Sequence, residues 1–131
     1  MKIGFTGSRN IRILTEEMLK ELDKIKNDDI IIHGGAIGAD SLVREWCNLN
    51  NIAQEIIRPI NPSNRSHYLY RNIEVITKCD KLIAFWDGES RGTKFTMDYA
   101  KSRNKEVILV RLSKKWKKIN KRREKSKSLD K

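Results

Sequence analysis

Three glycine-containing segments of the chain have the composition of phosphate-binding loops. They span residues 7–9 (Gly-Ser-Arg), 34–40 (Gly-Gly-Ala-Ile-Gly-Ala-Asp) and 87–93 (Asp-Gly-Glu-Ser-Arg-Gly-Thr), and each follows a short apolar run. Backbone N–H groups exposed at glycine turns, beside the positive end of a helix dipole, bind anions. Alternatively, the glycines only make tight strand-to-helix turns. The presence of three such segments favours an anion site.

The segment 34–40 differs from the common nucleotide-binding fingerprints. Its spacing is Gly-Gly-x-x-Gly, and it contains neither Gly-x-Gly-x-x-Gly nor a closing Gly-Lys-Ser/Thr. Asp40 can accept a hydrogen bond from a ribose hydroxyl, or it can act only as a partner of the helix dipole. In the segment 87–93, Gly92 and Thr93 can surround a phosphate, although Ser90 or Thr93 can equally cap the next helix.

Arg71, followed by Asn72, is the strongest candidate for a charged ligand contact. An arginine can pair with a phosphate through two hydrogen bonds, and the alternative is a solvated arginine on a helix surface. His33, at the end of an apolar run, is expected to be a buried, hydrogen-bonded residue rather than a catalyst. Tyr68 can stack on a base or pack into the core. No metal-ligand cluster or catalytic triad is evident, and no cofactor is predicted.

Hydrophobic periodicity predicts the elements that must position these residues. Five apolar runs alternate with four amphipathic stretches, which is typical of an α/β protein. We expect a Rossmann-like, doubly wound, mainly parallel five-stranded sheet with helices on both faces, and ligands outside the carboxyl ends of its strands. The expected strands are 2–6, 29–33, 54–57, 81–86 and 106–112, and the expected helices are 15–25, 40–49, 68–77 and 93–102.

The chain of 131 residues has the length of one domain, and its positive charge is uneven. The net charge is +11, of which the segment 113–131 carries +8 through ten basic and two acidic residues. This segment is expected to be a basic tail, partly helical or disordered. Trp116 and Ile119 can pin a short helix to the sheet, with disorder beyond about Arg122. Its charge favours either nonspecific nucleic-acid binding through residues 114–131 or simple solubilisation.

Targeting and cysteine patterns point to a cytoplasmic protein. No apolar run reaches the ~18 residues that a membrane span needs, and no signal peptide is visible at the beginning of the sequence. The two cysteines, Cys47 and Cys79, have no spacing typical of a zinc site or a disulfide framework.

The residues 7–9, 34–40, 71–72 and 80–93 together resemble the SLOG superfamily, which is named for DNA-processing protein A and the lonely-guy phosphoribohydrolases. The resemblance covers residues 1–112 and is closest to small stand-alone YspA-type members of bacteria and phages. It implies binding of a nucleotide-derived ligand (ADP-ribose-like, a cyclic nucleotide signal or a nucleoside phosphate) by a sensor or sequestering protein in phage or bacterial defence signalling.

The resemblance also implies which residues contact the ligand and how copies of the chain associate. A homodimer or higher homo-oligomer is expected, with an interface around Tyr70, Phe95 and Tyr99. The expected ligand-binding residues are Gly7, Ser8, Arg9, Gly34, Gly35, Gly38, Ala39, Asp40, Arg71, Asn72, Asp87, Gly88, Ser90, Gly92 and Thr93.

The same comparison favours binding over catalysis. Lonely-guy enzymes cleave a nucleotide N-glycosidic bond with an arginine from an Arg-Lys motif and a glutamate three residues after Gly-Thr. Arg71 resembles that arginine, but Asn72 replaces the lysine and Thr96 occupies the acid position. Because such cleavage usually needs a carboxylate, Asp40 or Glu89 would have to substitute. A nucleotide N-glycosidase is therefore the alternative function, and nucleic-acid binding through the tail is a further one.

Overall fold

The five strands form one parallel sheet in the order β3-β2-β1-β4-β5. The computed structural model describes residues 1–129, with side chains described as far as Arg123. Strand order reverses between β1 and β4, so the loops that follow these neighbouring strands turn toward opposite faces and leave a crevice. The strands are β1 (Lys2–Gly7), β2 (Ile30–His33), β3 (Ala53–Ile56), β4 (Lys81–Trp86) and β5 (Glu106–Arg111).

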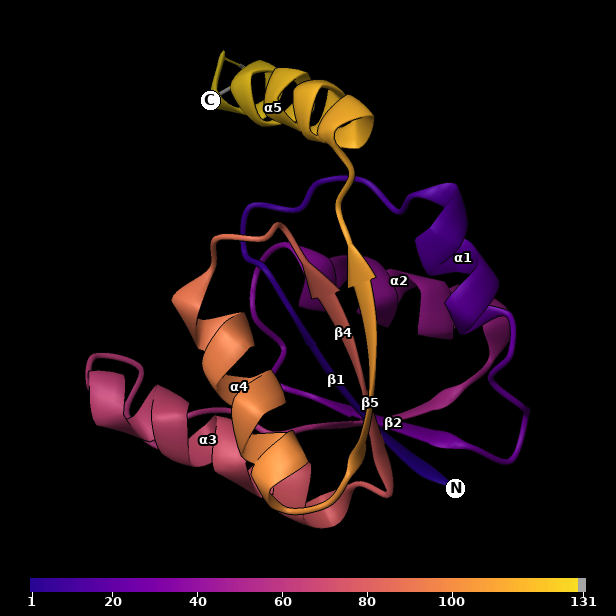
Figure 1. The fold of residues 1–131 in the computed structure, drawn as a ribbon, viewed down its shortest axis with the longest axis vertical. Helices are drawn as coiled ribbons and strands as arrows, with labels where there is room; N and C mark the ends of the chain where they lie inside the picture. Colours follow the sequence, from indigo (N-terminus) through magenta and orange to yellow (C-terminus); the bar gives the residue numbers. More distant parts are fainter. Residues whose placement is uncertain (130–131) are drawn as a thin grey trace.

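Helices cover both faces of the sheet, which confirms the predicted doubly wound fold. In Figure 1, α1 and α2 lie on one side of the strands, α3 and α4 lie on the other, and α5 stands beyond the carboxyl end of β5. The helices are α1 (Glu16–Leu22), α2 (Ala39–Asn50), α3 (Arg65–Lys78), α4 (Arg91–Ser102) and α5 (Lys114–Leu129).

Two of these helices begin where polar side chains cap them. The Thr15 hydroxyl accepts a hydrogen bond from the Met18 N–H at 3.3 Å and starts α1. The Asn64 side chain accepts from the Ser66 N–H at 2.9 Å, so α3 begins three residues before the predicted start at Tyr68. Asparagine is a favoured N-cap residue, but the apolar periodicity used for the prediction begins only later in the helix.

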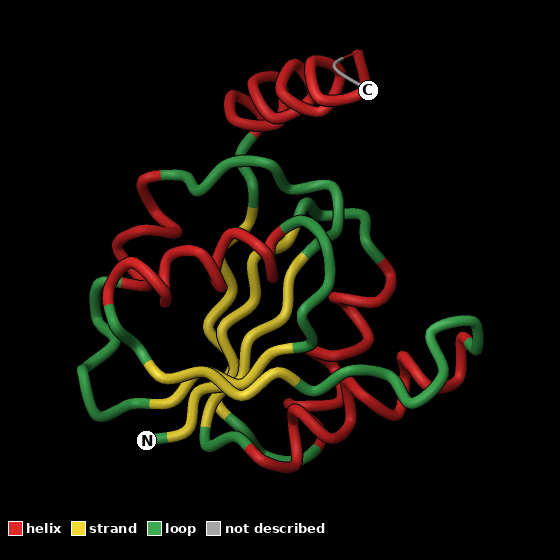
Figure 2. Tube along the Cα trace, turned by 180° about the vertical axis from the view of Figure 1, so that it is seen from behind, coloured by secondary structure: helices red, strands yellow, loops and turns green. Residues whose placement is uncertain are grey.

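Separate apolar layers hold the helices on the two faces. On the face of α1 and α2, the rings of Phe5 and Phe85 pack edge to face with centroids 4.9 Å apart. On the opposite face, Ile76 of α3 and Met97 of α4 pack against Leu82. Figure 2 shows the strands twisting apart toward the loops at their carboxyl ends. Because both layers are closely packed, these loops leave the sheet from fixed positions.

Helix α5 is docked onto the domain by two side chains. Trp116 packs against the larger apolar cluster, as the sequence predicts. The Asn120 side chain, only 2% exposed, accepts from the Arg12 N–H at 2.6 Å and donates to the Asn10 carbonyl at 2.8 Å. The helix continues to Leu129, beyond the point where the sequence predicts disorder. Residues 130–131, also part of that prediction, lie outside the described residues.

Within residues 1–129, no helix has both the length and the apolar character required to cross a membrane.

The two hydrogen bonds of Asn120 predict a stability effect that the sequence gives no reason to expect. Asn120→Ala leaves the partly buried Arg12 N–H and Asn10 carbonyl without these partners, and we expect a loss of about 1–3 kcal/mol in the free energy of unfolding. Urea unfolding measures it. Asn27→Ala, at an exposed turn, is the control and should change stability by less than about 0.5 kcal/mol. Equal stability of the two variants would show that α5 does not depend on Asn120.

Candidate ligand-binding site

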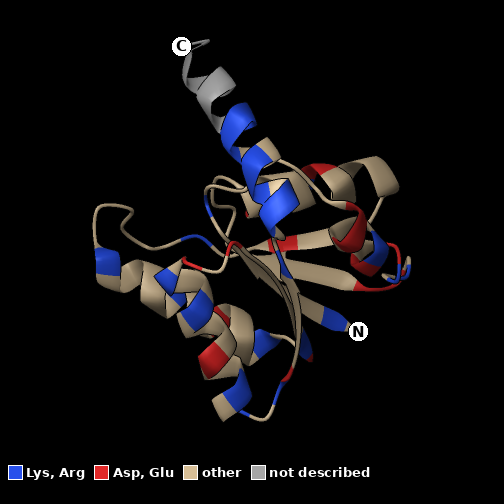
Figure 3. Ribbon diagram, turned by 45° about the horizontal axis from the view of Figure 1, so that its top comes forward, with Lys and Arg blue, Asp and Glu red and all other residues tan. Residues whose placement is uncertain are grey.

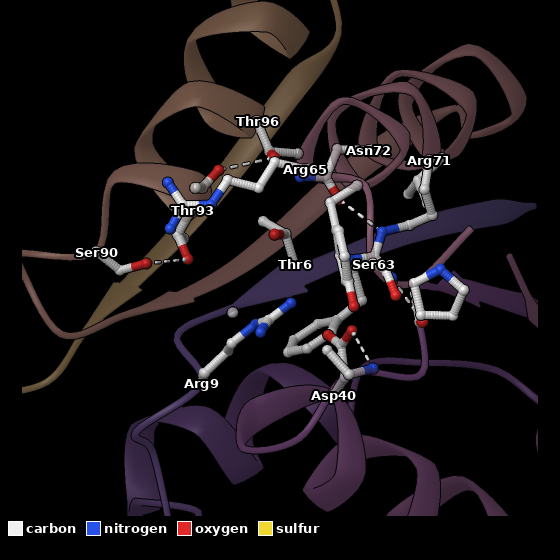
Figure 4. Close-up of a pocket in the computed structure, with 18 residues that line it drawn as sticks. Thr6, Arg9, Asp40, Ser63, Arg65, Arg71, Asn72, Ser90, Thr93 and Thr96 are labelled. Carbon is white, nitrogen blue, oxygen red and sulfur yellow. Dashed lines mark hydrogen bonds between the residues drawn. The ribbon is translucent and has the colours of Figure 1, made fainter. Parts of the chain in front are cut away.

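A cleft of about 560 Å³ opens at the carboxyl edge of the sheet, where the loops after β1 and β4 diverge. Its volume lies within the range of small-molecule binding sites. Figure 4 shows side chains from α2, α3, α4 and the loop after β1 pointing toward it. The predicted residues that line it are Gly7, Arg9, Gly34, Asp40, Arg71, Asn72, Ser90, Gly92 and Thr93.

The amino end of α4 faces the cleft without a side-chain cap. Ser90 is the N-cap residue, but its hydroxyl lies 3.2 Å from the Thr93 hydroxyl and makes no capping bond to the helix. The first N–H groups of a helix have no partners within it, so those of Gly92 and Thr93 remain available to a ligand. A Cβ added at Gly92 would meet no atom within 4 Å. The geometry is that of a helix N-terminal anion site.

Ser8 and Asp87, which were predicted to contact ligand, instead join the two loops to each other. The Asp87 carboxylate accepts from the Ser90 N–H at 2.8 Å, from the Glu89 N–H at 2.9 Å and from the Ser8 hydroxyl at 3.2 Å. Burial alone would raise the pKa of Asp87, but these hydrogen bonds hold it below its usual value. Neither residue lines the cleft. The Ser90 N–H is likewise used internally and is not part of a phosphate nest.

Arg71 projects from α3 into the floor of the cleft and is only 8% exposed. Its Nη1 donates to the Gly34 carbonyl at 2.7 Å and its Nε donates to the Asn72 side chain at 2.9 Å. A Cβ at Gly34 would overlap with the guanidinium, so a larger residue at this position would displace Arg71 from where it lies. Burial lowers the pKa of Arg71, and Asp40 opposes that effect. Arg71 is therefore a fixed cation rather than a solvated surface residue.

Tyr68 lies between the two arginines of the cleft. The guanidinium carbons of Arg9 and Arg71 lie 5.0 and 5.3 Å from the centre of its ring. Both distances fall within the range of cation–π contacts. The half-buried ring therefore positions the arginines, which the prediction for Tyr68 did not anticipate.

Asp40 places a buried carboxylate on the opposite wall, in the first turn of α2. One oxygen accepts from the Ala36 N–H at 3.1 Å, whereas Oδ1 is buried and has no partner. Burial is the largest influence on this group and raises the pKa of Asp40, although His33 and Arg71 act in the opposite direction. An unpartnered buried acceptor in a cleft is suited to receive a hydrogen bond from a ligand hydroxyl.

Some of the residues predicted to contact ligand hold neighbouring elements close together. Gly38 has a φ of 83°, and a Cβ there would overlap with the Arg9 backbone. A Cβ at Gly7, which does line the cleft, would overlap with the Ala39 side chain, so these residues bring β1 and α2 together. The predicted residues that line neither this cleft nor the cavity beside it are Ser8, Gly38, Ala39, Asp87 and Gly88, whereas Gly35 lines the adjoining cavity.

His33 is a buried structural residue, which confirms the prediction made for it. Its Nδ1 accepts from the Gly35 N–H at 3.0 Å, and its Nε2 lies 2.9 Å from the Gln54 side-chain oxygen. Because Nδ1 accepts, the proton of the neutral ring belongs on Nε2. Both ring nitrogens are therefore occupied within the protein.

The cleft also contains residues that were absent from the predicted set. Arg65 and Ser63 enter it from the beginning of α3, where only the Asn64 cap signals a helix start. Thr96 lines the cleft one turn after Gly92 and donates its hydroxyl to the Gly92 carbonyl at 2.9 Å. Glu89, predicted as a substitute catalytic acid, is exposed and lies outside the cleft.

A second cavity, of about 390 Å³, adjoins the first at Arg71 and Tyr68. Arg9 and Gly34 also line both cavities, so the two spaces are parts of one site. The outer part adds Arg58 and two exposed aliphatic side chains, Ile37 (63% exposed) and Ile60 (91% exposed).

These features define a Rossmann-like α/β protein with an arginine-lined cleft at the switch point of its sheet. Comparison with protein families, with curated proteins and with solved structures finds no match to the chain. Membership of the SLOG superfamily therefore stays a prediction that rests on the motif residues of the sequence.

The burial of Asp40 predicts an effect of pH on stability. A carboxylate whose pKa is raised on folding destabilises the folded state at neutral pH, and this penalty disappears as pH falls to about 4. Asp40→Asn should therefore raise the melting temperature at pH 7 by a few degrees, equivalent to about 1 kcal/mol. The difference from the wild type should shrink between pH 7 and 4. A variant that melts lower than the wild type at both pH values would contradict this assignment.

Proposed function

We propose that this protein binds a nucleotide-derived ligand through a phosphate and a sugar hydroxyl, as a sensor or sequestering protein. The proposal rests on one arrangement: the uncapped amino end of α4 and the unpartnered oxygen of Asp40 face the same cleft. The N–H groups of the helix are suited to a phosphate, whereas the carboxylate can accept only from a donor such as a ribose hydroxyl.

The charges around the cleft support an anionic ligand. Arg9, Arg65 and Arg71 line it, and Asp40 is the one carboxylate among the described lining residues. Arg71 is held in place by Gly34 and Asn72, so little side-chain entropy is lost when it pairs with phosphate. Arg9 and Arg65 are exposed at the mouth, where they can attract and close over the ligand.

The outer cavity favours a ligand longer than a mononucleotide. It adds a further guanidinium, from Arg58, beyond the position of Arg71. A pyrophosphate lying beside Arg71 could place the adenosine of an ADP-ribose-like ligand in one cavity and its terminal ribose in the other. Among the predicted ligands, an ADP-ribose-like molecule therefore fits better than a nucleoside monophosphate.

Hydrolysis of an N-glycosidic bond is the second candidate function. Asp40 lines the cleft and is the residue that could supply the carboxylate which this reaction usually needs. Its raised pKa would suit a group that exchanges a proton. Against it, Thr96 occupies the expected acid position and its hydroxyl is bonded to Gly92. Asp98, the next acidic residue along α4, does not line the cleft and is paired with Lys94 at 2.9 Å on the exposed side of the helix. Binding without turnover is therefore the function that the geometry supports best.

Association into a homodimer or higher oligomer is part of the proposal. Tyr70 is 62% exposed, and Phe95 stacks on Tyr99 with ring centres 6.2 Å apart. Exposed aromatic side chains of this kind are common at protein interfaces.

Ligand binding is tested by the melting temperature in the presence of ADP-ribose, AMP and ribose 5-phosphate. A ligand at 100 times its Kd adds about 2.7 kcal/mol to the free energy of unfolding. We expect the largest increase with ADP-ribose and a smaller one with AMP. Unchanged melting with all three compounds would remove the support for the proposal.

Gly92→Asp is the variant designed for this measurement. A carboxylate in the first turn of α4 favours the helix, because it interacts with the positive end of its dipole, but it repels a phosphate at the same place. The variant should thus melt at or above the wild-type temperature and lose the shift with ADP-ribose. Asn104→Asp adds the same charge at the turn before β5, near the other edge of the sheet, and should keep the shift.

Turnover is tested by chromatography of AMP and ADP-ribose after incubation with the protein. We expect both compounds to be recovered intact, because Asp40 has no second acid beside it in the cleft. Release of free adenine by the wild type, and not by Asp40→Asn, would establish the hydrolase alternative in place of simple binding.

A further inference from the structure

The described part of α5 carries seven cations and no carboxylate between Lys114 and Arg123. Figure 3 shows that most of this part of the helix is blue, and that it projects beyond the sheet. The cations are Lys114, Lys115, Lys117, Lys118, Lys121, Arg122 and Arg123.

Most of these cations and the residues that attach α5 to the domain lie on opposite sides of the helix. At about 100° per residue, Lys114, Lys118 and Lys121 are within about 60° of one another, and Trp116 and Asn120 lie on the opposite side. Burial agrees with this division, because Asn120 is buried and Trp116 is half-buried, whereas those lysines are exposed. Six of the seven cations fall within an arc of about 160°; they are Lys114, Lys115, Lys117, Lys118, Lys121 and Arg122, here called the cationic face.

The helix that carries the cationic face is attached to the domain by two of its side chains. Trp116 packs into the apolar cluster, and Asn120 bonds to the backbone on both sides of Ile11. A flexible solubilising extension would need neither contact. Because the backbone of α5 is already ordered, binding a partner along it loses less conformational entropy than ordering a free tail.

We propose that the cationic face binds the phosphate backbone of double-stranded nucleic acid without reading its sequence. Cations on successive turns are about 5.4 Å apart along the helix, and each strand of a duplex presents a phosphate every ~3.4 Å of its axis. Several lysines can therefore meet phosphates at once. This surface is separate from the cleft and does not depend on the function proposed for it.

The exposed side of α5 favours nucleic acid over a lipid surface. Stable attachment of a helix to a membrane requires apolar side chains that enter the lipid. Here Trp116 is already used against the domain, and the cationic face contains no apolar residue. The described residues of the cationic face therefore offer charge alone, which suits a surface of phosphates.

The experiment is fluorescence anisotropy with a labelled 20-base-pair duplex of arbitrary sequence, in 50–200 mM salt. The test variant replaces Lys114, Lys118 and Arg122 by Gln, and the control replaces Lys20, Lys24 and Lys26 by Gln. Both variants lose three positive charges. We expect the test variant to bind at least tenfold more weakly at 100 mM salt, with a salt slope smaller by about 3, and the control to stay within twofold of the wild type.

Three results would overturn the proposal: no binding of the wild type at 50 mM salt, an equal loss in both variants, or equal affinity for phosphatidylserine-containing phosphatidylcholine vesicles or polyglutamate. Melting temperatures of both variants establish that they fold. The ADP-ribose shift is measured in parallel. If the wild-type protein binds the duplex but shows no ADP-ribose shift, the result counts against the proposed ligand function alone. If it shows the shift but does not bind the duplex, the result counts against this inference alone.

Discussion

The hydrogen bonds between Ser8 and Asp87 determine the geometry of the cleft. The ladder between β1 and β4 ends where the Ser8 N–H donates to the Phe85 carbonyl at 3.0 Å, and beyond this point the two loops turn to opposite faces of the sheet. The Ser8 hydroxyl both donates to Asp87 and accepts from its backbone N–H at 3.1 Å. Asp87 in turn accepts hydrogen bonds from the Glu89 and Ser90 N–H groups just before α4. These bonds fix the position of the amino end of α4 relative to the loop after β1.

The cleft contains polar groups that have no hydrogen-bond partner within the protein. The amino end of α4 is uncapped although Ser90 stands at the position of a good cap. Asp40 is buried with one oxygen unpartnered, although a neutral asparagine there would avoid the cost of burying a charge. Both features lower the stability of the free protein. Such unfavourable groups persist mainly where a ligand or a reaction makes use of them.

The sequence was sufficient to predict the fold and the edge of the sheet at which the cleft opens. Buried parallel strands appear as continuous runs of Ile, Leu and Val, and glycine loops after such runs mark the carboxyl edge. It was not sufficient to separate residues that face the cleft from residues that hold the loops. Ser8 and Arg9 are neighbours in one motif, yet only Arg9 lines the cleft, because side-chain direction at a turn depends on tertiary hydrogen bonds.

The role of Asn120 lies furthest from what periodicity can predict. It occupies the middle of a highly charged segment, where an asparagine is unremarkable in type, and its partners are more than a hundred residues away in the chain. Those partners, Asn10 and Arg12, belong to the same loop as Arg9. The basic helix and the cleft are therefore supported by one short segment of backbone. Its conformation is fixed from the side of β4 by Asp87 and from the side of α5 by Asn120, and the guanidinium of Arg9 extends from it to the Tyr68 ring at the mouth of the cleft.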